Sequence, residues 1–142
     1  MESTTPTFNY LRAKLSEWKA NDMLLPSAEV SWARFQEVAT DQLLPVLCEA
    51  QDALKAAGLE VSITDLDEET RCLGLYVKDV GLFFAPAEDG MTVCFMARRF
   101  TGNEQGYESR FLYKRVKPEP LRRLVEEALL RLLGPRRSHG QR

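Results

Sequence analysis

The chain has 142 residues, of which 44% are hydrophobic and 28% are charged, and its formal net charge is −2. This length suits one domain with its own hydrophobic core, and the composition is that of a folded protein rather than a disordered one. The sequence contains no apolar run of the roughly 20 residues that cross a bilayer, and its N-terminus lacks the pattern of a signal peptide. We therefore expect a cytoplasmic protein with no membrane association, formed by a single domain over residues 1–135 and a mobile basic tail over 136–142.

Cysteine and histidine are too scarce and too scattered to predict a metal or redox site. Cys48, Cys72 and Cys94 show no CxxC spacing, and the one histidine, His139, lies in the polar tail. A zinc site needs at least three protein ligands of the nitrogen or sulfur kind close together, so we expect no metal and no cofactor. Cys72 and Cys94 fall on expected strands, where a free cysteine usually behaves as a small buried hydrophobe.

Two helical segments are expected before residue 58. Apolar side chains of the first segment recur at helical spacing: Phe8, Leu11, Leu15 and Trp18. Thr5 and Pro6 suit the N-cap and the first helical position, which predicts an amphipathic helix of about four turns that docks through this stripe. The second segment runs from about 28 to 57 and contains Pro45. An interior proline removes a backbone hydrogen bond, so we expect a kink or break there.

Five short segments of alternating polar and apolar residues follow, and they predict five β-strands. Their expected ranges are 59–64, 71–78, 80–86, 91–100 and 107–116. The short connections force antiparallel neighbours and favour a meander. Asp89-Gly90 predicts a two-residue type I′ turn, and an amphipathic helix is expected after Pro118. The predicted fold class is α+β.

Pleating assigns the two faces of this sheet, because successive side chains point to opposite sides. A two-residue turn at Asp89-Gly90 pairs Phe84 with Phe95 and Phe83 with Met96. One face then forms the obvious core, with Leu73, Leu75, Val77, Leu82, Phe84, Val93, Phe95, Phe111 and Tyr113. The opposite face carries Cys72, Gly74, Tyr76, Phe83, Ala85, Cys94, Met96 and Leu112, with Arg98, Arg110 and Lys114 near the last strand. That second face is too apolar for an ordinary wet surface.

The second face could be buried in three ways. The C-terminal helix or the kinked second helix could lie across it. A second copy of the chain could pair with it through a two-fold axis. A different protein or an apolar ligand could also bind, oriented by the basic rim. The candidate partner-binding residues are Tyr76, Phe83, Met96, Leu112, Arg98, Arg110 and Lys114.

Charge is distributed unevenly along the chain. Residues 1–97 hold 7 Lys+Arg and 16 Asp+Glu, a net of −9, whereas residues 98–142 hold 12 and 5, a net of +7. Pairing within the fold or between subunits could satisfy this split. Nucleic-acid contact through the basic C-terminal third is an alternative, but the isoelectric point of about 5.5 and the lack of a recognisable binding motif argue against a dedicated binder.

The sequence contains no catalytic signature such as G-x-S-x-G, a glycine-rich phosphate loop or H-E-x-x-H. An enzyme is therefore not the favoured class, and a small-molecule or catalytic pocket between sheet and helices is kept as an alternative. We expect a non-enzymatic protein-binding module, such as an adaptor, a chaperone-like protein or a regulatory subunit. It would act as a homodimer or with another protein.

In size and element content the chain is similar to small acidic bacterial secretion chaperones, which combine helices with a twisted antiparallel sheet that dimerises. Those proteins carry a helix between the third and fourth strands, whereas Asp89-Gly90 leaves no room for one here. The similarity is therefore an analogy for function.

Overall fold

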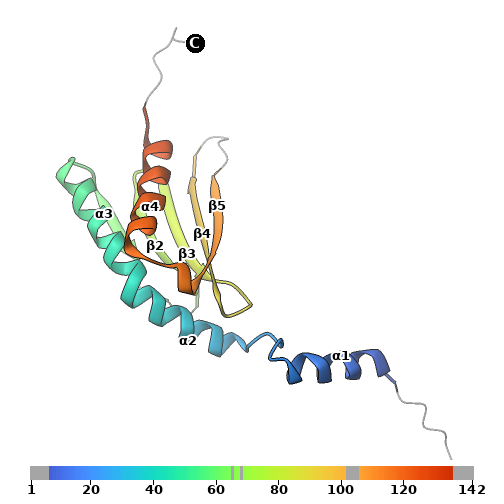
Figure 1. Ribbon diagram of the computed structural model, residues 1–142. Coiled ribbons are helices and arrows are strands. Elements are labelled where there is room, and N and C mark those ends of the chain that lie inside the picture. Colours follow the sequence, from blue (N-terminus) through green and yellow to red (C-terminus); the bar gives the residue numbers. More distant parts are fainter. Residues whose placement is uncertain (1–6, 65, 68, 102–105, 136–142) are drawn as a thin grey trace, which may run out of the picture.

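The chain folds as an α+β protein in which a five-stranded antiparallel sheet carries helices on one face (Figure 1). This is a computed structural model, and it describes residues 7–64, 66–67, 69–101 and 106–135. The expected helix start at Thr5 and Pro6 and the expected tail over 136–142 lie outside these ranges. No helix in the described part of the chain is long and apolar enough to cross a membrane.

The helices are α1 (Asn9–Ala20), α2 (Ala28–Val38), a π turn (Ala39–Leu43), α3 (Leu44–Ala56), a 3-10 turn (Tyr113–Arg115) and α4 (Pro118–Leu133). The expected kink is confirmed, because α2, the π turn and α3 form one bent rod with Pro45 in the first turn of α3. Proline has no N–H and clashes with the carbonyl four residues earlier, here that of Asp41. The π turn that contains Asp41 accommodates this local break in the α-helical pattern.

The strands are β1 (Val61–Thr64), β2 (Leu73–Val77), β3 (Val80–Pro86), β4 (Thr92–Arg99) and β5 (Tyr107–Leu112). They pair antiparallel in chain order, so the predicted meander is confirmed. The predicted register is also correct, since Phe84 lies opposite Phe95 and Phe83 opposite Met96.

The predicted type I′ turn between β3 and β4 is wrong. Beyond the Ala87 N–H bond to the Thr92 carbonyl (3.0 Å) the loop has four residues, and only Gly90 among them has a positive φ, of 71°. The Asp89 carboxylate organises this loop by accepting from the Met91 N–H (2.9 Å) and the Thr92 hydroxyl (2.6 Å). Two-residue and four-residue loops centred on the same point give the same strand pairing, which is why the register was still predicted correctly.

The fifth strand is shorter than expected, because it ends at Leu112 rather than continuing to Val116. The Tyr113 N–H donates to the Met91 carbonyl (2.8 Å), and the Val116 N–H donates to the Tyr113 carbonyl (3.0 Å), which closes a 3-10 turn. Tyr113 still packs against the core as expected. Lys114 lies in the turn and not on the strand, so its predicted place on the second sheet face is wrong.

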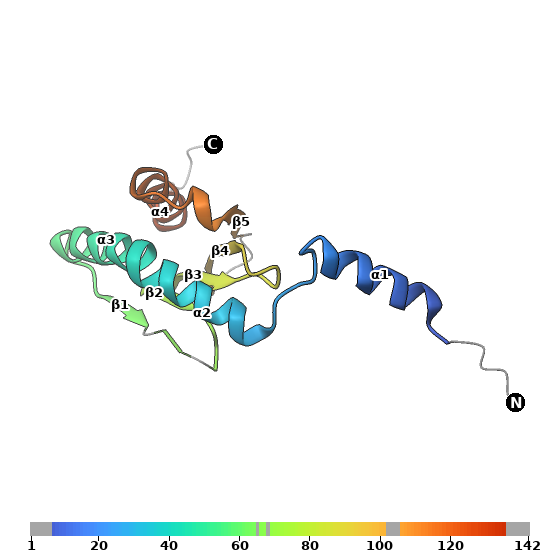
Figure 2. The same cartoon turned by 60° about the horizontal axis from the view of Figure 1, so that its bottom comes forward.

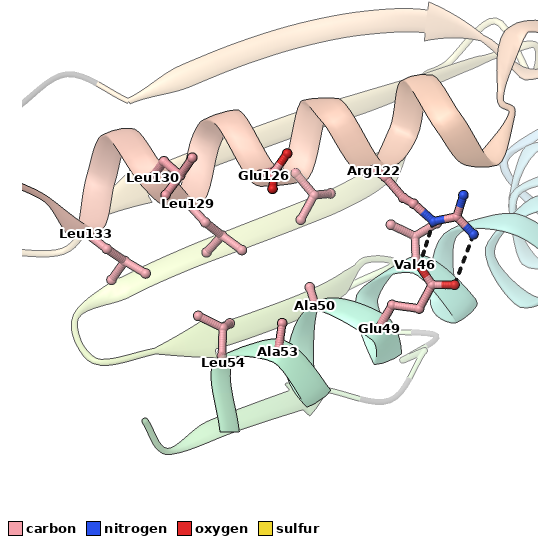
Figure 3. A pocket seen from close by; sticks show the side chains of 11 residues that line it. Val46, Glu49, Ala50, Ala53, Leu54, Arg122, Glu126, Leu129, Leu130 and Leu133 are labelled. Carbon is pink, nitrogen blue, oxygen red and sulfur yellow. Dashed lines mark hydrogen bonds and ion pairs between the residues drawn. The ribbon is translucent and has the colours of Figure 1, made fainter. Parts of the chain in front are cut away.

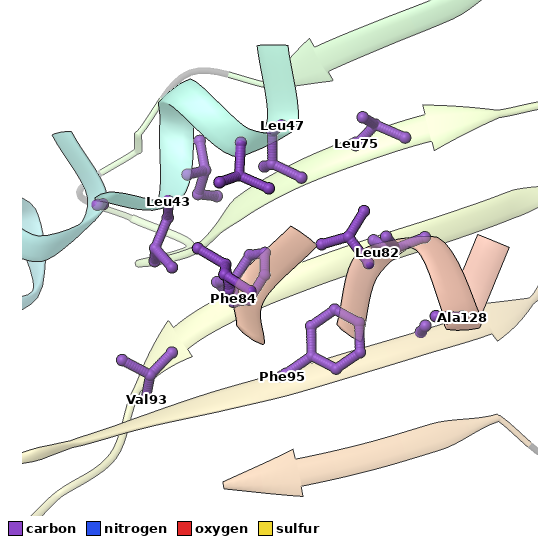
Figure 4. Close-up of a cluster of buried hydrophobic side chains, with 14 of the residues drawn as sticks. Leu43, Leu47, Leu75, Leu82, Phe84, Val93, Phe95 and Ala128 are labelled. Atoms are coloured by element: carbon purple, nitrogen blue, oxygen red, sulfur yellow. The ribbon is translucent and has the colours of Figure 1, made fainter. Parts of the chain in front are cut away.

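The core fills the space between the inner sheet face and the helices (Figure 4). The largest fully buried side chains include Phe35, Leu43 and Leu47 from the helical rod and Leu73, Leu75, Leu82, Phe84, Val93 and Phe95 from the strands. The Phe84 and Phe95 rings lie 4.9 Å apart. α4 closes the core with Leu121, Val125, Ala128, Leu129 and Leu132.

The first helix does not dock on this core, so the expected docking of its apolar stripe is wrong. No residue of α1 is buried, and Figures 1 and 2 show the helix extending away from the sheet. Phe8, Leu11 and Leu15 are 74%, 47% and 39% exposed. An amphipathic pattern predicts that a stripe needs a partner, but it does not say that the partner belongs to the same chain.

Candidate functional site

The second sheet face, here called the outer face, is not covered by the chain's own helices in the described structure. Register places on it Gly74, Tyr76, Gly81, Phe83, Ala85, Cys94, Met96, Arg98, Arg110 and Leu112. α3 and α4 both lie against the inner face (Figures 1 and 2), so the expectation that one of them covers the outer face is wrong. The physical reason is that each helix has a single apolar stripe, and the core uses it.

Three aromatic rings form a cluster on the outer face. Tyr76 and Phe83 meet edge to face with ring centres 5.4 Å apart. The Phe100 ring contacts both, stacked on Tyr76 at 6.0 Å and edge to face with Phe83 at 6.1 Å. These separations fall in the range in which aromatic pairs attract one another. Phe100 is nevertheless 48% exposed, so the cluster presents a broad apolar surface to solvent.

Gly81 makes this arrangement possible. A Cβ atom added at Gly81 would lie 2.7 Å from a Phe100 ring atom and 2.9 Å from a Phe83 ring atom. The absence of a side chain at Gly81 therefore leaves the space that the Phe83 and Phe100 rings occupy.

The turn between β2 and β3 fixes the backbone of Phe100. The Phe100 N–H donates to the Asp79 carbonyl at 2.8 Å, and the Thr101 hydroxyl donates to the Asp79 carboxylate. The hydrogen bond from Thr101 is the main reason that the pKa of Asp79 is lowered. The Arg99 guanidinium, 3.6 Å from the Asp79 carboxylate, also lowers this pKa. The ring of Phe100 is thus held on the face by residues outside the cluster.

Two arginines border the aromatic cluster. The Arg98 guanidinium lies 5.6 Å from the centre of the Phe100 ring, a cation–π contact. Arg110 lies on β5 opposite Cys94. Both arginines are exposed, and neither forms an ion pair with a described residue. Their charge is therefore available to an anionic group of a partner.

The predicted site residues do not form one continuous patch. Phe83 and Met96 are direct neighbours, and Tyr76 contacts Phe83. Leu112 pairs with Thr92, four residues along β4 from Met96, which corresponds to roughly 13 Å. The small side chains of Ala85 and Cys94 lie between them. Burial raises the pKa of the Cys94 thiol, so Cys94 acts here as a small apolar residue.

Phe100 is the functional candidate that sequence reasoning missed. The alternation that placed Met96 and Arg98 on the outer face leads to Phe100 two residues later. Gly81 lies opposite Arg98 and gave a second signal, because a glycine inside a strand often marks a close approach of other atoms.

A separate apolar groove runs between α3 and α4 (Figure 3), with a volume of about 380 Å³. Its lining residues are Val46, Glu49, Ala50, Ala53, Leu54, Arg122, Val125, Glu126, Leu129, Leu130 and Leu133. At one end Arg122 donates two hydrogen bonds to Glu49, at 2.6 and 3.1 Å, and the pKa of Glu49 is lowered mainly by this contact. The other lining residues are apolar except Glu126, so the groove offers no converging set of catalytic groups.

The described residues contain no candidate metal site. Within residues 7–64, 66–67, 69–101 and 106–135, no three His, Cys, Asp or Glu side chains lie close enough together to hold an ion.

Comparison of the chain with protein-family models, with curated protein sequences and with solved structures found no match. Evidence for a function therefore comes from the geometry of the outer face and of the groove.

Proposed function

We propose that the protein is a non-enzymatic protein-binding module whose outer face binds another polypeptide. The supporting observation is the cluster of Tyr76, Phe83 and Phe100, which lies on a sheet face that no described helix covers. Aromatic residues and arginine are the side chains that most often dominate binding energy at protein interfaces. Both kinds meet here, since Arg98 lies over the Phe100 ring.

The apolar part of the face provides the affinity in this proposal. Phe100 is 48% exposed and Met96 is 38% exposed. Exposed apolar patches of a few hundred Å² usually mark an interaction site. Removing such an area from water contributes several kcal/mol, at roughly 25 cal/mol per Å², before the cost of ordering the partner.

The charged part of the face provides the selectivity. Arg98 and Arg110 favour a partner that carries carboxylates next to its apolar residues, because opposite charges steer association and exclude partners of like charge. In a symmetric homodimer through this face, the arginines of both copies would approach one another, with Glu108 as the neighbouring counter-charge. We therefore favour an acidic segment of a different protein, with self-association as the competing arrangement.

An adaptor, a chaperone-like protein or a regulatory subunit would each use such a face. The three cysteines are unpaired, which fits a reducing compartment such as the cytoplasm in which we place this activity.

The test replaces Phe83 and Met96 together with glutamate and measures molecular mass by light scattering and the set of co-purifying proteins. We expect the substitutions to abolish a complex that the wild-type protein forms, with an unchanged circular dichroism spectrum. Val30→Glu is the matched control, because it also places a charge at an exposed apolar residue, but on α2, away from both the outer face and the α3–α4 groove. A wild-type protein that is a monomer without bound partners, with a folded variant that behaves identically, would rule out the proposal.

A further inference from the structure

The segment before α2 concentrates exposed apolar surface. Seven of the twelve exposed large hydrophobic side chains in the described structure lie between residues 8 and 25, at Phe8, Tyr10, Leu11, Leu15, Met23, Leu24 and Leu25. A helix of 12 residues is marginally stable in water without tertiary contacts. α1 therefore requires a partner surface for its apolar stripe, defined here as Phe8, Leu11, Leu15 and Trp18.

The end of α1 is fixed by local hydrogen bonds. The Met23 N–H donates to the Trp18 carbonyl at 2.7 Å, and the Asp22 N–H donates to the Lys19 carbonyl at 3.3 Å. Asp22 has a φ of 56°, so these two bonds form a Schellman cap with Asp22 in the left-handed position. The Asn21 side chain also donates to the Glu17 carbonyl, at 2.9 Å. Residues 24–27 then link this cap to α2, with Ser27 as the N-cap of α2, whose side chain accepts from the Val30 N–H at 3.3 Å.

The groove between α3 and α4 has the dimensions of a helix site. Its lining extends along α4 from Arg122 to Leu133, which is about 16 Å of helix, and α1 is about 18 Å long. Ala50 and Ala53 give α3 a shallow side on which a third helix can lie closely. In Figure 3 leucines from both helices, including Leu54, Leu129 and Leu133, line the end away from the Glu49–Arg122 pair.

We infer that α1 of one chain docks into the α3–α4 groove of a second copy. This inference concerns a different surface from the outer sheet face and does not depend on the proposed function.

Chain length argues against docking of α1 in the groove of its own chain. Residues 24–27 give five Cα–Cα steps from Met23 to Ala28, which together span at most about 18 Å. The groove begins at Val46, eighteen residues along the bent rod from Ala28 and so roughly 25 Å away, and it extends further to Leu54. Docking of α1 in the groove of its own chain would therefore need a fully extended linker. A second copy removes this restriction.

Charge also favours the groove over the outer face as the site for α1. The helix carries Arg12, Lys14 and Lys19 against one acidic residue, Glu17, a net of +2. The groove is lined by the carboxylates Glu49 and Glu126 against the guanidinium of Arg122, a net of −1. The outer face presents Arg98 and Arg110 against Glu108, a net of +1, which would repel α1.

A reciprocal exchange gives enough contact for a stable dimer. Each stripe brings two aromatic side chains of roughly 150–250 Å² each and two leucines, partly exposed in the free chain. Two stripes, with the groove walls that cover them, approach the roughly 1,200–2,000 Å² buried in stable interfaces.

The decisive experiment measures solution mass at tens of micromolar protein. We expect the wild-type chain of 16.2 kDa to give twice that mass. Leu11→Glu combined with Leu15→Glu, and separately Ala53→Glu, should give the monomer mass, with affinity reduced at least about 100-fold. Ala53 is exposed in the free chain, so this substitution leaves the core intact. Ala13→Glu, on the opposite side of α1 from the stripe, is the matched control and should remain dimeric.

A mixing experiment then tests the pairing of the two surfaces directly. The α1 variant retains an intact groove, and the Ala53→Glu variant retains an intact stripe, so an equimolar mixture at raised concentration should form a complex of dimer mass. A monomeric wild-type chain, an α1 variant that stays dimeric, or a mixture that stays monomeric would each overturn the inference. A dimer that is broken only by glutamate at Phe83 and Met96 would overturn it as well, and would indicate self-association through the outer face.

Discussion

Phe83 and Phe84 are adjacent on β3, yet Phe84 lies in the core on the inner face and Phe83 lies on the uncovered outer face. Phe84 is fully buried on the inner face and packs 4.9 Å from Phe95. Phe83 points to the outer face, where its ring contacts only two other rings of a partly exposed cluster. Both faces are apolar enough to form a core. The difference teaches that the number and position of amphipathic helices, rather than sheet composition, decide which face is covered.

The outer face reduces its own exposure without a covering layer. Phe100 folds over Gly81 and shields parts of Tyr76 and Phe83, both of which are half-buried. This self-contact lowers the cost of leaving the face open in the free protein. It also keeps the rings in a defined arrangement, which limits the side-chain entropy lost when a partner binds.

The largest expected effect distinguishes the two faces by stability. Phe84→Ala should lower the free energy of unfolding by about 3–5 kcal/mol, because it opens a cavity in a filled core. Phe83→Ala should cost about 1 kcal/mol, since it removes ring contacts at a half-exposed site. Urea unfolding of both variants measures the difference. Equal losses would contradict the assignment of Phe83 to an open face.

A smaller effect tests how the outer cluster is built. Gly81→Ala places a Cβ atom 2.7 Å from the Phe100 ring and should displace it, with a loss of about 1–2 kcal/mol. In a Phe100→Ala background the same change should cost clearly less, because one of the two crowded rings is absent. A double-mutant cycle from urea unfolding gives the coupling. Additive effects would show that Phe100 does not lie over Gly81.

The smallest effect concerns the loop that sets the register of both faces. The pKa of Asp89 is lowered in the folded protein, mainly by the hydrogen bond from the Thr92 hydroxyl and next by the hydrogen bond from the Met91 N–H. A lowered folded pKa contributes stability above the unfolded pKa of about 3.9, and this stability is lost as pH falls through the folded value. Asp89→Asn should therefore lower the free energy of unfolding at pH 7 by less than about 1 kcal/mol at this solvent-screened site, and the melting temperature with it. The difference from the wild-type protein should shrink below pH 4.

Glu88→Gln is the control for this loop, because the Glu88 side chain makes no hydrogen bond or ion pair with a described residue. It should leave the melting temperature unchanged at both pH values. A pH-independent loss in Asp89→Asn would show that the loop depends on shape rather than on the Asp89 charge.

Those residues of the candidate site that follow from the alternation of side chains along a strand were predicted correctly. Tyr76, Phe83, Met96, Arg98 and Arg110 lie on the outer face as expected. Lys114 was misplaced because hydrogen bonds to Met91 and within the 3-10 turn end β5 at Leu112, and side-chain alternation contains no information on such bonds. Phe100 was within reach of the same rule but needed the space above Gly81 to be recognised.

The sequence by itself determined the order of the elements, the kink at Pro45, the antiparallel meander and the pairing of Phe84 with Phe95, because each follows from local backbone chemistry or from short connections. Only the tertiary structure decided that α3 and α4 share the inner face and that α1 stays undocked. Periodicity shows that a stripe is apolar, but which surface buries it depends on the shape of the packed core, the reach of the linkers and the free energy of all competing contacts.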